Sequence, residues 1–198
     1  MAAVAQPKPR MTVEEFFAWG GGGHAGKLEL VDGVVRAMAP ASATHALMQG
    51  NIVAAIHAHL RASGGRCRVA PEAPVRPALG HGINARVPDI AVTCAPPSTS
   101  RTFDEPILII EVMSPSNDDD TWESIRALAP LPTLREIVVV QSERIGIEVY
   151  RKGVDGGWPD GPEGTLDAAG TFRLESIGLD LTVADVYAGT HLEPAQGR

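Results

Sequence analysis

The stretch ILIIEVMSPS, residues 107–116, places the acidic side chain of Glu111 directly after four apolar residues. A continuous apolar run is typical of a strand that is buried on both faces of a sheet. A carboxylate at the end of such a strand is poorly solvated, so it needs a cation, a network of hydrogen bonds or a proton. Glu111 is therefore the first candidate for a functional residue.

A second carboxylate, Asp89, stands in the sequence Val87-Pro88-Asp89 at the start of an earlier predicted strand. If the two strands are neighbours, Asp89 and Glu111 point to one place and form the hard-oxygen site that Mg²⁺ prefers. A bound Mg²⁺ polarises a phosphoryl oxygen and lowers the pKa of a water molecule, which is the main requirement for phosphodiester hydrolysis. The structural alternative is that Asp89 caps a turn and Glu111 pairs with an arginine.

Apolar periodicity and turn residues predict the other elements. An Asp32-Gly33 turn between two alternating runs predicts a β-hairpin over residues 27–38. The remaining predicted elements are helices at 13–19, 43–62, 119–128 and 183–187 and strands at 67–75, 87–93, 107–112, 137–140, 145–151, 171–174 and 179–181. This order predicts an α/β fold with a mixed central β-sheet flanked by helices. Residues 11–190 are expected to form one domain, with a loose leader at 1–10 and a tail at 191–198.

The net charge of −7 argues against a protein that coats nucleic acid, because such binding neutralises many phosphates. It does not exclude an enzyme that acts on nucleic acid at one site. Basic residues are concentrated between residues 61 and 86, where five arginines accompany one acid. Four of these arginines are candidates for contact with backbone phosphates, and simple solvation is the equally open alternative: Arg66, Arg68, Arg76 and Arg86.

The two cysteines, Cys67 and Cys94, are far apart in the sequence. They are too few for a disulfide scaffold or a thiolate zinc site, so two reduced thiols are expected. No apolar segment is long enough to span a membrane, and the N-terminus lacks the pattern of a signal peptide. The cytoplasm is therefore the expected compartment.

Several motifs together resemble the Uma-type restriction endonuclease family, a branch of the PD-(D/E)XK nuclease superfamily. They are LELVDG at 28–33, Pro40 with His45, Val87-Pro88-Asp89, EVMSPS at 111–116 and LPTLRE at 131–136. The resemblance covers about residues 12–151. It implies a restriction-endonuclease-like core that hydrolyses phosphodiester bonds of DNA, with Mg²⁺ or Mn²⁺ held by Asp89, Glu111 and the carbonyl of Val112. It also implies a third acid at Glu29. A homodimer is an open expectation, because this fold cuts both strands most readily as a two-fold dimer.

The sequence departs from the superfamily pattern at one position. The pattern has a lysine two residues after the strand glutamate, where this chain has Met113, and the helix that follows contains no lysine. Arg126 of that helix could supply charge but not a base. Lys27 lies outside the matching motifs, and we expect it to point to the opposite face of its strand from Glu29.

Two interpretations follow from the missing lysine. In the first, Gln141 at the end of a core strand or His45 before the long helix takes part in catalysis. In the second, the chain is a catalytically impaired nuclease-fold protein that acts as a nucleic-acid or protein binding module. Retained carboxylates favour the enzyme, and the missing lysine favours the binding module.

Overall fold

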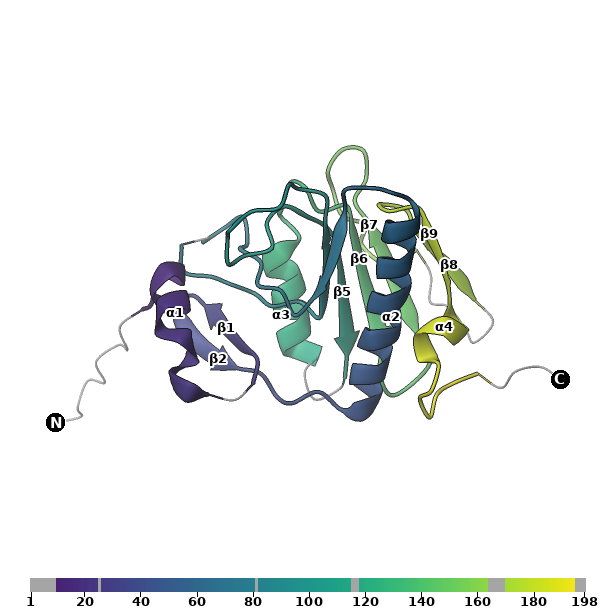
Figure 1. The fold of residues 1–198 in the computed structure, drawn as a ribbon, viewed down its shortest axis with the longest axis horizontal. Coiled ribbons are helices and arrows are strands. Elements are labelled where there is room, and N and C mark those ends of the chain that lie inside the picture. The colour runs from purple at the N-terminus through teal and green to yellow at the C-terminus, as the bar shows by residue number, and fades with distance from the viewer. Residues whose placement is uncertain (1–9, 25, 81, 115–117, 164–169, 195–198) are drawn as a thin grey trace.

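The structure is a computed structural model that describes residues 10–24, 26–80, 82–114, 118–163 and 170–194. At its centre is a five-stranded sheet in the order β3-β4-β5-β6-β7. Figure 1 labels β5, β6 and β7 of this sheet. The strands are β3 (Arg68–Pro71), β4 (Ile90–Thr93), β5 (Pro106–Met113), β6 (Glu136–Gln141) and β7 (Ile147–Arg151). Strands β5 and β6 run parallel and the other neighbours antiparallel, which confirms the predicted mixed sheet. The apolar run at 107–110 lies in β5, the middle strand.

Helices cover the two faces of this sheet (Figure 1). Helix α2 (Ala43–Ala62) packs with Leu108, Ile110 and Val112 of β5, and helix α3 (Asp118–Leu128) packs with Ile109 and Met113. Because alternate residues of a strand point to opposite faces, the side chain of Glu111 lies on the α3 side.

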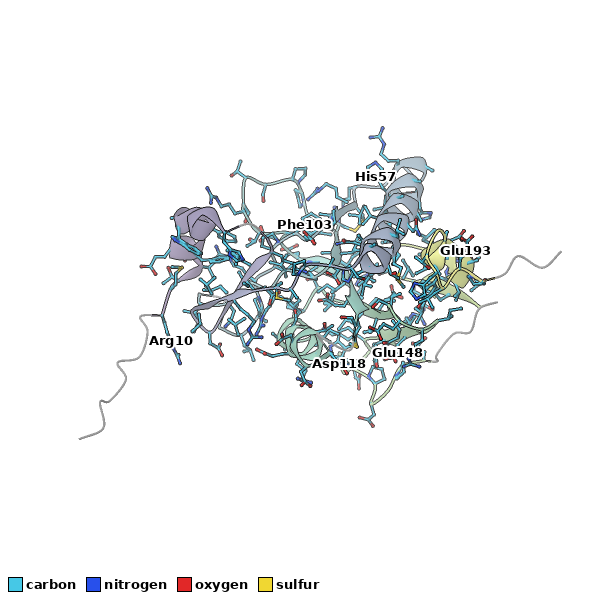
Figure 2. All side chains as sticks on the ribbon, turned by 90° about the horizontal axis from the view of Figure 1, so that it is seen from below. Arg10, His57, Phe103, Asp118, Glu148 and Glu193 are labelled. Carbon is cyan, nitrogen blue, oxygen red and sulfur yellow. A yellow bond between two sulfur atoms is a disulfide. The ribbon has the colours of Figure 1, made fainter. Side chains whose placement is uncertain are left out.

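The C-terminal elements complete the α2 side of the core. They are β8 (Thr171–Leu174), β9 (Leu179–Thr182) and α4 (Val183–Tyr187), and all of them contribute buried side chains to the cluster that contains α2. Helix α3, on the other face of the sheet, has three acids in its first turn, where they complement the helix dipole. Figure 2 shows one of these acids, Asp118, at the edge of the molecule.

The N-terminal elements form a separate unit. Helix α1 (Val13–Trp19) begins with a capping box formed by Thr12 and Glu15, and a 3₁₀ turn, η1 (Gly20–Gly23), follows it. The predicted hairpin is confirmed as β1 (Leu28–Val31) and β2 (Val34–Ala37). Both turn residues have positive φ, 48° at Asp32 and 78° at Gly33, as a tight hairpin turn requires.

The hairpin is joined to the rest of the chain by the loop that precedes β4. Leu30 and Ala85 exchange backbone hydrogen bonds of 3.0 and 2.9 Å, and the Gly33 N–H donates to the Ile83 carbonyl at 2.7 Å. Leu30 and Ala85 are also fully buried beside α1. These contacts place β1 next to the segment that leads into Asp89.

The prediction of two reduced thiols is wrong, because Cys67 and Cys94 form a disulfide. Arg68 faces Thr93 in the antiparallel β3–β4 ladder, so the two cysteines form the next facing pair. Strand pairing brings the two cysteines together although they are 27 residues apart in the chain. The disulfide fastens β3, an edge strand, to the interior of the sheet.

We expect replacement of both cysteines by serine to lower the free energy of unfolding by about 3–4 kcal/mol, the loop-closure effect for a ring of this size. Chemical denaturation measures this difference. A reductant should destabilise the wild-type protein by a similar amount and leave the double-serine variant unchanged. If the unfolding midpoint of the wild type were the same with and without reductant, this prediction would be wrong.

The longest helix, α2, has 20 residues. None of the helices in the described ranges combines the length and the apolar character needed to cross a bilayer.

Candidate active site

Asp89 and Glu111 lie side by side at the end of two neighbouring strands. Asp89 directly precedes β4, and Glu111 follows Ile110, which faces Ile90 in the ladder. The Asp89 N–H donates to Glu111 Oε2 at 3.2 Å, and the Val112 N–H donates to Asp89 Oδ2 at 2.8 Å. Both residues are 5% exposed. The two acids singled out from the sequence therefore share one buried centre.

Lys27 lies at the same centre, contrary to the expectation drawn from the sequence. Its Nζ is 3.0 Å from Asp89 Oδ1. Residues 27 and 29 are two apart, so they share a face of the strand instead of pointing to opposite faces. Glu29 is buried there as well, where Oε1 accepts a hydrogen bond of 2.7 Å from the Val87 N–H.

The first two turns of α2 support Asp89 from another side. His45 Nε2 lies 3.4 Å from Asp89 Oδ1, and the Gln49 side-chain amide donates to the Asp89 carbonyl at 2.8 Å. Ser42 caps the helix by accepting from the His45 N–H. The sequence analysis did not include Gln49. Its spacing of four from His45, which puts both side chains on one helix face, is the signal that could have found it.

The charges at this centre perturb one another. Burial alone would raise the pKa of Asp89, but the hydrogen bond from His45 and the charge of Lys27 outweigh it and lower this pKa to about 2. Burial would likewise lower the pKa of Lys27, yet the charges of Asp89, Glu111 and Glu29 raise it. Burial and the neighbouring Asp89 charge raise the pKa of Glu111 well above its usual value. The positive charge of Lys27 favours the ionised form of Glu111 but does not outweigh these two effects.

The two carboxylates suit Mg²⁺ or Mn²⁺ better than zinc. Within the described ranges, no group of three or more His, Cys, Asp or Glu side chains could hold a metal ion. Mg²⁺ needs only one or two protein carboxylates, since it keeps several waters, whereas structural and catalytic zinc sites take three or four protein ligands. A second cation would also offset the buried charge of Glu111.

Met113 occupies the position where the superfamily pattern has lysine. Its side chain is 4% exposed and packs in the apolar cluster on the α3 side. Gln141 faces Met113 across the β5–β6 ladder, and its side-chain nitrogen is 3.9 Å from the Met113 sulfur. Of the two polar residues predicted to compensate for the lysine, His45 contacts Asp89, whereas Gln141 contacts Met113.

The structure contradicts the predicted phosphate contact by Arg86. The Arg86 side chain is 4% exposed, and its Nη2 donates to Glu123 of α3 at 2.9 Å. Its Nη1 lies 3.6 Å from Glu29 Oε2. A buried arginine that bridges two glutamates has no free face for a phosphate. It ties the hairpin residue Glu29 to α3 instead.

The other three arginines lie elsewhere. Arg76 is half-buried and pairs with Glu14 of α1 at 2.9 Å. Arg66 and Arg68 lie at the far end of β3, because Arg68 faces Thr93 whereas Pro71 faces Ile90, next to Asp89. Phosphate contact by Arg66, Arg68 and Arg76 stays a prediction, and none of the three forms an ion pair with Asp89 or Glu111 within the described ranges.

We expect Arg86→Met to lower the free energy of unfolding by about 3 kcal/mol, because it leaves the buried Glu29 carboxylate without its cation. Urea denaturation measures the loss. The salt dependence of DNA binding should stay as in the wild type, since Arg86 contacts no phosphate. If DNA affinity instead fell less steeply with salt concentration in the variant while its stability stayed unchanged, Arg86 would contact a DNA phosphate.

An open pocket of about 890 Å³ leads to this centre. Lys27, His45 and Asp89 line it, together with residues 38–42 of the connection between β2 and α2. Glu72 also lines the pocket, and its φ of 48° is a left-handed conformation that is uncommon outside glycine. Its N–H donates to the Asp89 carbonyl at 3.0 Å. A ligand in the pocket would therefore meet the ammonium of Lys27 and the carboxylate of Asp89 together.

Comparisons with known proteins identify the family and the fold of this chain. A model of the Uma2 family, described as "Putative restriction endonuclease", matches residues 13–184. An uncharacterized protein of Synechocystis sp., slr1290, is 30% identical over 186 residues, which cover 92% of this chain and 94% of that protein. The crystal structure of a "putative nuclease belonging to DUF820" from Anabaena variabilis aligns with a TM-score of 0.67 at 16% identity. That alignment covers 89% of this chain and 97% of the other, and at this identity it shows a shared fold.

Proposed function

Because this chain belongs to the Uma2 restriction endonuclease family, we propose that it is a metal-dependent endonuclease that hydrolyses phosphodiester bonds of DNA. The observation that carries the proposal is the pair Asp89 and Glu111, which are buried side by side, with Asp89 lining an open pocket. Lys27 neutralises Asp89, but the Glu111 carboxylate is costly to the fold unless a further cation or a proton neutralises it, so the pair favours a metal-binding role.

Asp89 and Glu111 would hold Mg²⁺ or Mn²⁺, with the Val112 carbonyl as a third ligand. The N–H of Val112 donates to Asp89, and the N–H and C=O of one strand residue point to the same neighbour, so this carbonyl is directed to the same side. When bound, the ion would polarise a phosphoryl oxygen of the DNA and lower the pKa of the attacking water.

The chain's own residues would keep these ligands in position. The Val112 N–H and His45 orient Asp89 from two sides, while the Asp89 N–H orients Glu111. Glu29 is fixed by the Val87 N–H and the nearby guanidinium of Arg86, so we assign it the role of completing the acidic shell. Groups that are preorganised in this way need no rearrangement during the reaction.

The proposal is tested by incubating the purified protein with supercoiled plasmid and Mg²⁺ or Mn²⁺. We expect the supercoiled form to be converted to nicked and linear DNA, and EDTA to stop the conversion. If no DNA is cut at high protein concentration while Mn²⁺ binding is still detected by calorimetry, the endonuclease proposal fails. The chain would then be a nuclease-fold binding module.

A further inference from the structure

We propose that Lys27, which lies 84 positions before Glu111 in the chain and directly precedes β1, contacts the scissile phosphate and replaces the lysine that the PD-(D/E)XK pattern places two residues after the strand glutamate. This inference rests on the proposed function. It assigns a catalytic role to a residue outside the PD-(D/E)XK motif. This residue precedes β1, which belongs to a different sheet from β4 and β5.

The other lysines and arginines considered for this role are either exposed or bound to other groups. Arg126 of α3 is exposed, and Arg86 is buried between Glu123 and Glu29. Lys152 donates to the Leu131 carbonyl at 2.8 Å. Among the lysines and arginines in the described ranges, Lys27 alone forms an ion pair with Asp89 or Glu111.

Lys27 is held where a phosphate can reach it. Its carbonyl accepts the Met38 N–H at 3.0 Å, so the hairpin fixes the backbone at this residue. Its side chain is 17% exposed and lines the pocket. An ammonium group has three N–H donors, and Asp89 accepts one of them, so the others are available to a phosphate oxygen of the substrate.

The charge of Lys27 suits the reaction. During hydrolysis a water oxygen forms a bond to phosphorus while the bond from phosphorus to the leaving deoxyribose oxygen breaks. The water gives one proton to the solvent, and the leaving oxygen takes one from the solvent. Negative charge grows on the phosphoryl oxygens, and the ammonium of Lys27 offsets it while keeping its own protons throughout.

The same contact makes a second, independent prediction. Lys27 and a divalent ion both interact with Asp89, and the two positive charges repel each other at short range. Removing the ammonium group should therefore tighten metal binding, whereas removing a contact needed to hold Asp89 in place would weaken it. Calorimetric titration with Mn²⁺ measures this directly.

The experiment compares Lys27→Met, Lys27→Arg and the matched control Lys152→Met. We expect Lys27→Met to slow plasmid cleavage about 100-fold, the effect of removing one donor to a developing oxyanion. It should also raise the affinity for Mn²⁺ by about threefold or more, the direction that charge repulsion sets. Lys27→Arg should recover part of the lost rate, because it restores the charge with a different shape. Lys152→Met should cut like the wild type.

The outcomes separate this inference from the proposed function. If Lys27→Met cuts at the wild-type rate while Asp89→Asn does not cut, Lys27 is not catalytic and the endonuclease proposal stands. If Lys27→Met neither cuts nor binds Mn²⁺, its defect is a disrupted acidic centre, and the inference is overturned. A wild-type protein that does not cut overturns both.

Discussion

We expect Asp89→Asn to lower the initial rate of Mn²⁺-dependent plasmid cleavage at least about 10³-fold, the upper range for loss of one preorganised group. The substitution keeps the size of the side chain but removes a charged ligand of the proposed metal. It also turns an amide NH₂ toward groups that now donate to the carboxylate, among them Lys27 and His45. The variant should thus bind Mn²⁺ poorly as well as react slowly.

Thermal unfolding with and without Mn²⁺ provides the supporting measurement. At a metal concentration 100 times the dissociation constant, binding should stabilise the wild type by about 2.7 kcal/mol. That corresponds to a rise in Tm of roughly 5–10 °C for a chain of this length. Asp89→Asn should show almost no rise.

Asp180→Asn makes the same chemical change at an exposed ion pair with Arg173 on the β8–β9 hairpin. It should cut and respond to metal as the wild type does. If Asp89→Asn cleaved the plasmid at the rate of this control, Asp89 would have no role in the reaction.

We expect Glu111→Gln to abolish cleavage and yet to stabilise the metal-free protein, by roughly 1–3 kcal/mol at pH 8, the penalty typical of an unsatisfied buried polar group. Burial and the charge of Asp89 raise the pKa of Glu111 in the folded state. The folded state therefore binds more protons than the unfolded state, and the free energy of unfolding falls as the pH rises from the unfolded pKa through the folded pKa. Glutamine carries no charge and avoids this loss.

The size of this gain should depend on pH. The difference in unfolding free energy between Glu111→Gln and the wild type should grow between pH 5 and pH 8, as measured by urea denaturation in EDTA. Glu175→Gln changes an exposed glutamate near Arg151 and should show no such growth. A difference that shrinks with pH would mean that Glu111 is ionised and satisfied without metal.

The sequence predicted those features whose signals are local. The run at 107–110 and the Asp32-Gly33 turn each depend on residues within a few positions, and β5 and the hairpin follow them closely. The strand predicted at 67–75 is shorter in the structure, because β3 ends at Pro71 and only an isolated bridge between Val75 and Arg86 follows.

The site was predictable only in part, because most of its contacts join distant parts of the chain. Asp89 and Glu111 could be paired because each lies at a strand end. Lys27 is 62 residues from Asp89, and Arg86 is 37 residues from Glu123. Their contacts depend on how the hairpin and α3 dock onto the sheet, which hydrophobic periodicity does not report. The disulfide required the register of β3 on β4 for the same reason.

The β1–β2 hairpin belongs to a different sheet from Asp89 and Glu111, although Lys27 and Glu29 come from it. Backbone hydrogen bonds, the small cluster around Leu30 and the ion pairs of Lys27, Glu29 and Arg36 hold it in place. Whenever heat detaches the hairpin, the ammonium leaves with it and the carboxylates remain behind on the sheet. Such local opening needs less free energy than unfolding the whole chain. The proposed cleavage of DNA should therefore stop on warming several degrees before the protein melts, and return at once on cooling.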